Sequence, residues 1–68
     1  MKLIGREWNA YLMQYEHTWL ADEESELSAG FDPDSAVGSM VMVISTESVW
    51  IKNTDGLWQK SGTTEVLT

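Results

Sequence analysis

Few residues in this chain could do acid–base or nucleophilic chemistry. His17 is the only side chain with an ordinary pKa near neutrality, and the chain has no cysteine. Its neighbour Glu16 would not face it on a helix, because consecutive helical residues point in different directions. No run of glycines has the spacing of a phosphate-binding or dinucleotide-binding loop. We therefore expect a protein that is not an enzyme and that carries no cofactor.

The carboxylates are numerous, but their spacing does not predict a metal site. Asp32 and Asp34 are separated by one residue, as in calcium-binding loops, yet Ala36 stands where the third ligand would follow. The glycine and the closing glutamate of such a loop are also missing. With one histidine and no cysteine, the chain lacks the cysteine and histidine ligands that a structural zinc site requires. We expect no bound metal.

An acidic patch stands out in the first half of the chain, and it bears on the choice of partner. It consists of Asp22, Glu23, Glu24, Glu26, Asp32 and Asp34. The whole chain has a net charge of −7, which argues against direct binding to nucleic acid, because phosphate contacts require clustered lysine and arginine. Two interpretations remain open: a solvated acidic surface, or a mimic of nucleic acid that blocks a basic binding site.

The second half of the chain predicts a β-meander with two tryptophans on its last hairpin. Asp55-Gly56 between two apolar runs is a strong hairpin signal, and a three-residue loop pairs Lys52 with Trp58 and Trp50 with Lys60. A two-residue first turn would pair Ile44 with Val49 and Val43 with Trp50. Residues 65–68 are expected to form a further, edge strand.

This register separates the meander into two faces. Val49, Ile51 and Leu57 are fully apolar and are predicted to face the core. The opposite face is predicted to be exposed and to bind a partner through Val41, Val43, Trp50, Lys52, Trp58 and Lys60. One alternative is that each lysine lies over a cross-strand indole and shields it from water. Another is that the tryptophans are covered, which would leave Val49, Ile51 and Leu57 as the binding face.

Several of these residues resemble a short module found in many small actinobacterial and actinophage proteins. The resemblance covers about residues 36–62 and rests on Val37-Gly38, Val41, Val49-Trp50, Asp55-Gly56, Trp58 and Gly62. The module has an Asp-Gly at its first turn, whereas this chain has Ser45-Thr46-Glu47-Ser48. The resemblance implies a β-meander in a phage-type accessory protein, and it implies no catalytic residue.

The first third of the chain is predicted to be a helix over residues 6–20. At 100° per residue, Trp8, Leu12, Tyr15 and Trp19 form one apolar stripe. Continued beyond Leu20, the same stripe would be occupied by acids, so the helix should end there. The acidic connector over residues 21–36 is then expected to be locally disordered and dispensable for folding.

These elements together predict one small domain over residues 1–68 with an α+β fold. One N-terminal helix over 6–20 would pack on a three- to four-stranded antiparallel β-meander over 37–68. No apolar run approaches the roughly 20 residues that cross a bilayer, so we expect no membrane contact. We expect a cytoplasmic location, which is the host cytoplasm if a phage encodes the protein.

The function that follows is a non-catalytic, acidic protein-interaction module. Its partner is expected to be a host or viral protein. Two other functions stay open: a nucleic-acid mimic acting through the acidic patch, and a structural subunit of a homo-oligomer such as a homodimer. Four tryptophans in 68 residues suit either a protein interface or an aromatic core.

Overall fold

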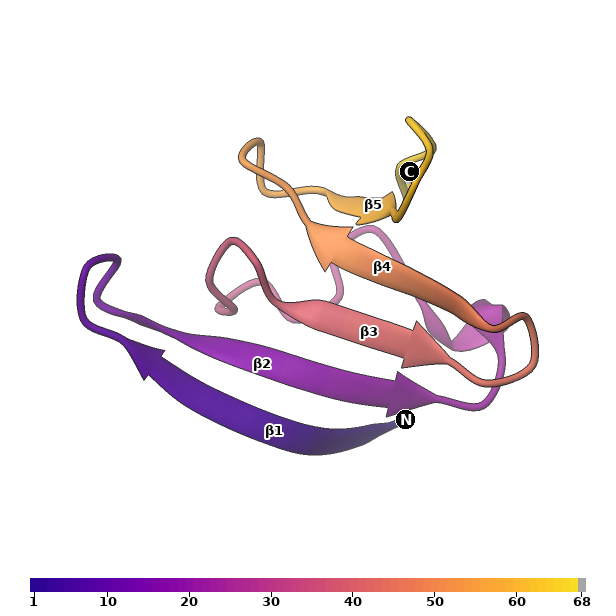
Figure 1. Cartoon of the computed structure of the whole chain (residues 1–68), viewed down its shortest axis with the longest axis horizontal. Coiled ribbons are helices and arrows are strands. Elements are labelled where there is room, and N and C mark those ends of the chain that lie inside the picture. Colours follow the sequence, from indigo (N-terminus) through magenta and orange to yellow (C-terminus); the bar gives the residue numbers. More distant parts are fainter. Residues whose placement is uncertain (68) are drawn as a thin grey trace.

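The protein folds into a single mixed β-sheet of five strands that lie in chain order (Figure 1). The structure is a computed structural model, and it describes residues 1–67. The strands are β1 (Lys2–Asn9), β2 (Gln14–Ala21), β3 (Met40–Val43), β4 (Ser48–Lys52) and β5 (Trp58–Lys60). Neighbouring strands are antiparallel except β2 and β3, which run parallel. Residues 22–39, hereafter the crossover, join these two strands and contain one 3-10 turn, η1 (Glu24–Glu26).

The predicted helix over residues 6–20 is wrong, and the same residues form the β1–β2 hairpin. The predicted α+β fold class is therefore also wrong, because the described residues contain no α-helix and the fold is all-β. Trp8 and Tyr15 are cross-strand partners whose rings lie 4.9 Å apart, so the hairpin brings them together as well as a helix would. The turn is held by the Asn9 side chain, whose Oδ1 accepts the Leu12 N–H at 3.0 Å.

The β-meander is confirmed, with one change of register. Trp50 pairs with Lys60 and Lys52 with Trp58, as the Asp55-Gly56 turn predicts. Gly56 has a φ of +78°, a backbone conformation that glycine adopts without a Cβ clash. In the first hairpin Val41, not Val43, lies opposite Trp50, because four residues instead of two form the turn. A shift of two residues keeps every side chain on its predicted face.

The residues that follow β5 pair with the sheet at isolated positions and do not form a strand. Val66 makes one isolated antiparallel bridge to Gln59, and the Leu67 N–H donates to the Trp58 carbonyl at 2.9 Å. The predicted edge strand over 65–68 is therefore reduced to this contact, and its last residue, Thr68, lies outside the described residues.

The core lies on the face of the sheet that carries the tryptophans. Its buried members are Ala21, Val41, Val43, Trp50 and Trp58, and Trp19, Leu27, Phe31 and Leu67 pack against them. The crossover runs behind β3 and β4 in Figure 1 and covers this face, supplying Leu27 and Phe31. The prediction that Val49, Ile51 and Leu57 face the core is wrong, because the covering segment packs on the opposite side.

The crossover is an ordered part of the fold, not the locally disordered connector that the sequence predicts. The buried Lys52 ammonium donates to the main-chain carbonyls of Asp32 at 3.2 Å and Ser35 at 3.1 Å. Ser35 and Ala36 are themselves buried. The covering segment thus joins the sheet through polar contacts as well as apolar ones, which compensates for its few hydrophobic residues. Within residues 1–67, no helix is long and apolar enough to cross a membrane.

Candidate functional site: an exposed apolar face

The residues predicted to form an exposed binding face lie together, but inside the protein. Trp50 and Trp58 are 2% and 1% exposed, and Val41, Val43 and Lys52 are buried beside them. The lysines do lie over the cross-strand indoles: Lys52 Nζ is 6.0 Å from the Trp58 ring centroid, and Lys60 Nζ is 5.9 Å from that of Trp50. Lys60 is half-buried at the edge of this group, and the other five side chains are buried under the crossover, so this face is not an exposed docking surface of the monomer.

The acidic patch divides between structural contacts and exposed charge. Glu24 accepts hydrogen bonds from the hydroxyls of Ser48 and Thr46, and its Oε1 lies 3.5 Å from Lys60 Nζ. The hydrogen bond from Ser48 is the main reason that the pKa of Glu24 lies below its usual value. This carboxylate therefore joins the crossover to β4 and β5.

Glu26 joins the crossover to the start of the chain. Its Oε1 accepts the Met1 ammonium at 2.6 Å, and its Oε2 accepts the N–H groups of Asp22 and Glu23. The bond from the ammonium lowers the pKa of Glu26 and raises that of the amino terminus. Asp22, Glu23 and Asp34 are exposed.

Asp32 forms a polar cluster with two residues of β2. Its Oδ2 lies 2.9 Å from His17 Nδ1 and accepts the Trp19 indole N–H at 2.7 Å. Fifteen residues separate His17 from Asp32, so sequence spacing gave no signal for this pair. The buried hydroxyl of Ser39 accepts the His17 backbone N–H at 3.0 Å, which ties the end of the crossover to β2. The cluster therefore orders the crossover, and the described residues contain no group of three or more side chains suited to a metal.

The other side of the sheet has no covering layer in the described part of the chain (Figure 1), and it carries a continuous group of apolar side chains. This face is turned toward the viewer in Figure 1, with the crossover behind it. Side chains alternate along a strand, so the residues next to the buried ones project here. We call Leu20, Met40, Met42, Val49 and Ile51 the apolar face. They form two cross-strand rows, Leu20–Met42–Val49 and Met40–Ile51.

The apolar face is accessible in spite of the size of its side chains. Met40 and Ile51 are each 36% exposed, and Leu20, Met42 and Val49 are half-buried. Ile44 and Leu57 follow β3 and precede β5, and they are exposed as well. Contiguous apolar area of this kind on a small protein is typical of an interaction surface.

Charged residues border the apolar face on β1 and β2. Lys2 lies opposite Leu20 at one end, and Glu7 lies opposite Glu16 at the other. Two carboxylates facing each other across strands repel, and the Asn9 side chain eases this by donating to Glu16 Oε2 at 2.8 Å. The edge nearest Glu7 and Glu16 is therefore negative.

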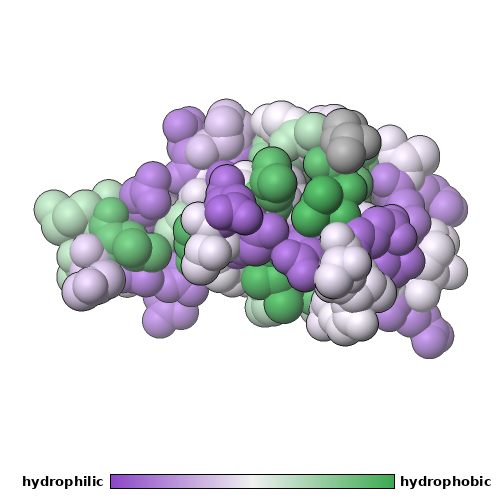
Figure 2. Space-filling view, turned by 90° about the horizontal axis from the view of Figure 1, so that it is seen from above, coloured by the Kyte–Doolittle hydropathy of each residue, from purple (hydrophilic) through white to green (hydrophobic). Residues whose placement is uncertain are grey.

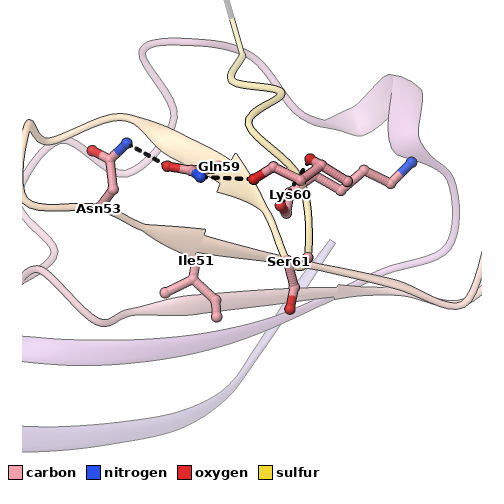
Figure 3. A pocket seen from close by; sticks show the side chains of 7 residues that line it. Ile51, Asn53, Gln59, Lys60 and Ser61 are labelled. Atoms are coloured by element: carbon pink, nitrogen blue, oxygen red, sulfur yellow. Dashed lines mark hydrogen bonds between the residues drawn. The ribbon is translucent and has the colours of Figure 1, made fainter.

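A shallow hollow of about 270 Å³ adjoins the apolar face at β4 and β5 (Figure 3). Ile51 lies on its lining, and Asn53 and Gln59 are joined across it by a 3.0 Å hydrogen bond. The Gln59 amide also donates to the Thr63 carbonyl at 2.7 Å. These amides already bind each other and the backbone, so they are not free to bind a polar ligand. We therefore treat the hollow as an extension of the apolar face.

A second group of exposed apolar residues lies at the β1–β2 turn. This end of the hairpin projects beyond the other strands (Figure 1), and hydrophobic residues gather there in Figure 2. Tyr11 and Met13 are 93% and 70% exposed. Arg6 stacks on Tyr15 at 3.7 Å, and Tyr15 meets Trp8 edge to face. Such cross-strand pairs stabilise an otherwise unsupported hairpin, which explains the aromatic residues here without a ligand.

We compared the chain with family models, curated proteins and solved structures. No family model, no curated protein and no solved structure matches the chain.

Proposed function

We propose that this protein is a non-catalytic interaction module that binds another protein through its apolar face. The observation that supports this is the uncovered side of the sheet, where five apolar side chains form adjoining rows with no covering layer from residues 1–67. Sheets are usually covered on every face that carries a continuous apolar surface. A partner would supply the missing layer. We place this activity in the cytoplasm, which is the host cytoplasm if the protein is a phage accessory factor.

The alternative function as a nucleic-acid mimic has weaker support. A mimic needs free carboxylates that stand in for phosphates. Glu24, Glu26 and Asp32 instead accept hydrogen bonds from the protein's own groups. A structural homo-oligomer would use the same apolar face, but every copy has a charge of −7, which opposes association of two copies.

The proposal is tested by changing the apolar face without touching the core. Immobilised parent protein and the variants Ile51→Asp, Met40→Asp and Tyr11→Asp are compared for the proteins they retain from host lysate. Tyr11→Asp is the matched control, because it adds the same charge at the fully exposed hairpin turn. We expect a partner that the parent and Tyr11→Asp retain and that Ile51→Asp and Met40→Asp lose, with all four proteins folded by circular dichroism.

The same comparison can reject the proposal. If folded Ile51→Asp and Met40→Asp retain the same proteins as the parent, the apolar face does not bind the partner. A complex that is lost in moderate salt but is insensitive to both substitutions would support the mimic instead.

A further inference from the structure

Resting on the proposed function, we infer the kind of partner segment that covers the apolar face. We propose that it is a basic amphipathic α-helix, which lies across β2, β3 and β4 with a lysine or arginine beside Glu7 and Glu16. Three properties of the face carry this inference: its dimensions, its methionines and its charged border.

The dimensions match one helix. The apolar residues occupy three adjacent strands, which span about 10 Å at a spacing of about 4.8 Å. The two rows are two residues apart along the strands, or about 7 Å. An α-helix with its side chains is about 10–12 Å across, so one apolar helix stripe would cover both rows. A helix on one face of a sheet is also a common second layer.

The methionines suit a helix surface supplied by another chain. Met40 and Met42 are two of the five residues of the apolar face, and they are the two from its central strand. Unbranched thioether side chains adjust to irregular surfaces, and flexible methionine-rich surfaces are a known means of accepting helices of different sequence. A face intended to pack permanently against this chain's own residues would gain more from branched side chains.

The charged border favours a basic helix over a second copy. Glu7 and Glu16 face each other at one end of the apolar face, with the Asn9 amide as a hydrogen-bond donor to Glu16. A cation between the two carboxylates would turn their repulsion into attraction. A second copy would bring another net charge of −7 to this surface, whereas a basic helix complements it.

Methionine methyl NMR tests the inference directly, because the chain carries its own internal control. The probes are two synthetic 18-residue amphipathic peptides with identical leucine positions, one with lysine and one with glutamate on the polar face. A scrambled lysine peptide of the same composition controls for charge alone. In the protein labelled at its methionine methyl groups, Met40 and Met42 report on the apolar face and Met13 reports on the distant hairpin turn.

We expect the amphipathic lysine peptide to shift the Met40 and Met42 signals saturably while Met13 stays unchanged. The scrambled and glutamate peptides should bind at least about tenfold more weakly. The double variant Glu7→Gln/Glu16→Gln should weaken binding of the lysine peptide about two- to fivefold, as the loss of exposed ion pairs does. Equal shifts with the scrambled peptide, or shifts confined to Met13, would overturn the inference.

Other outcomes separate this inference from the proposed function. Shifts of Met40 and Met42 that depend on protein concentration without peptide would identify a second copy as the occupant and overturn the helix. If Ile51→Asp loses its partner from lysate while neither peptide moves Met40 or Met42, the face binds a protein but not a basic helix. If both experiments fail, the proposed function fails as well.

Discussion

Trp58 donates its indole N–H to the main-chain carbonyl of Phe31 at 2.9 Å, and the two rings lie 5.6 Å apart. Twenty-seven residues separate them, and the contact fixes the middle of the crossover on the most buried tryptophan. The core of this small protein therefore depends on a segment whose only regular structure is the short 3-10 turn η1. This contact fixes the crossover on one side of the sheet, and no other segment of residues 1–67 covers the opposite side (Figure 1).

Removing the Phe31 side chain should loosen the crossover. Phe31→Ala is expected to lower the free energy of unfolding by about 2–4 kcal/mol, less than for a fully buried phenylalanine because Phe31 is half-buried. The tryptophan fluorescence should shift to the red as water reaches Trp19 and Trp58, the two indoles that pack against Phe31. Denaturant unfolding followed by fluorescence gives the value, and Tyr11→Ala is the control with an expected change within about 0.5 kcal/mol. Equal stability of the two variants would show that the crossover does not stabilise the sheet.

Acid should destabilise the protein through Glu24 and Glu26. Both pKa values are lowered in the folded protein from an ordinary 4.5, by the Ser48 hydroxyl and the Met1 ammonium respectively. Their contribution is present above pH 4.5 and is lost as the pH falls through the folded pKa values. The double variant Glu24→Gln/Glu26→Gln should therefore show a flatter stability profile below pH 4.5. Glu47→Gln, in the exposed β3–β4 turn, should keep the parental profile.

High pH should destabilise the protein through the Met1 ammonium, which is the partner of Glu26. The pKa of the Met1 ammonium is raised above its usual 8.0 by the hydrogen bond to Glu26. Stability from this group is complete below pH 8 and is lost as the pH rises through the folded pKa. Thermal unfolding between pH 7 and 10 should show this loss in the parent and not in N-terminally acetylated protein. A parental loss that survives acetylation would assign it to another group.

Substituting Asp32 tests the polar cluster behind the sheet, and the same substitution at Asp34 is its control. Asp32→Ala removes the acceptor of the Trp19 indole N–H and the partner of His17. A buried donor left without a partner costs about 1–3 kcal/mol, and the half-buried Trp19 indole should cost toward the lower end, so this variant should unfold at lower denaturant concentration. Asp34→Ala removes an exposed carboxylate of the same acidic patch and should change little. Equal effects would mean that net charge, and not the cluster, governs stability.

The meander could be predicted from sequence because its signals are local. Asp55-Gly56 fixes the β4–β5 register, and alternation then places Trp50, Lys52, Trp58 and Lys60 on one face. Which face is covered is not a local property. Leu27, Phe31 and Ala36 are scattered among acidic and small residues, and no local pattern indicates that their segment forms the second layer.

The sequence of the first hairpin predicts a helix because two periodicities fit the same residues. Trp8 and Tyr15 are seven apart, which suits a helix stripe, but they also lie opposite each other across a turn. The alternation of Tyr15, His17 and Trp19 with polar Glu16 and Thr18 was the available strand signal. The sequence predicts part of the apolar face, Val49 and Ile51, but only in the alternative in which the tryptophans are covered. Leu20 could not be added to it without the parallel pairing of β2 and β3.

Trp50 and Trp58 provide the sharpest test of the core. Both are almost fully buried, and each has a lysine ammonium about 6 Å from its ring. They differ in one respect: the Trp58 indole N–H has the Phe31 carbonyl as its acceptor, whereas the buried Trp50 indole N–H has no hydrogen-bond partner within the described structure. Substitution by phenylalanine removes a satisfied donor in one case and an unsatisfied donor in the other.

The two substitutions should therefore differ in cost although they remove the same atoms. Trp58→Phe leaves the Phe31 carbonyl unpaired, while Trp50→Phe relieves the penalty of a buried orphan donor. We expect Trp58→Phe to be the more destabilising by about 1–3 kcal/mol, since the loss of ring volume is common to both. Urea unfolding monitored by circular dichroism measures the difference without relying on either indole. Equal costs, or a larger cost for Trp50→Phe, would mean that the Trp50 N–H finds an acceptor in solution and that its burial is not a source of instability.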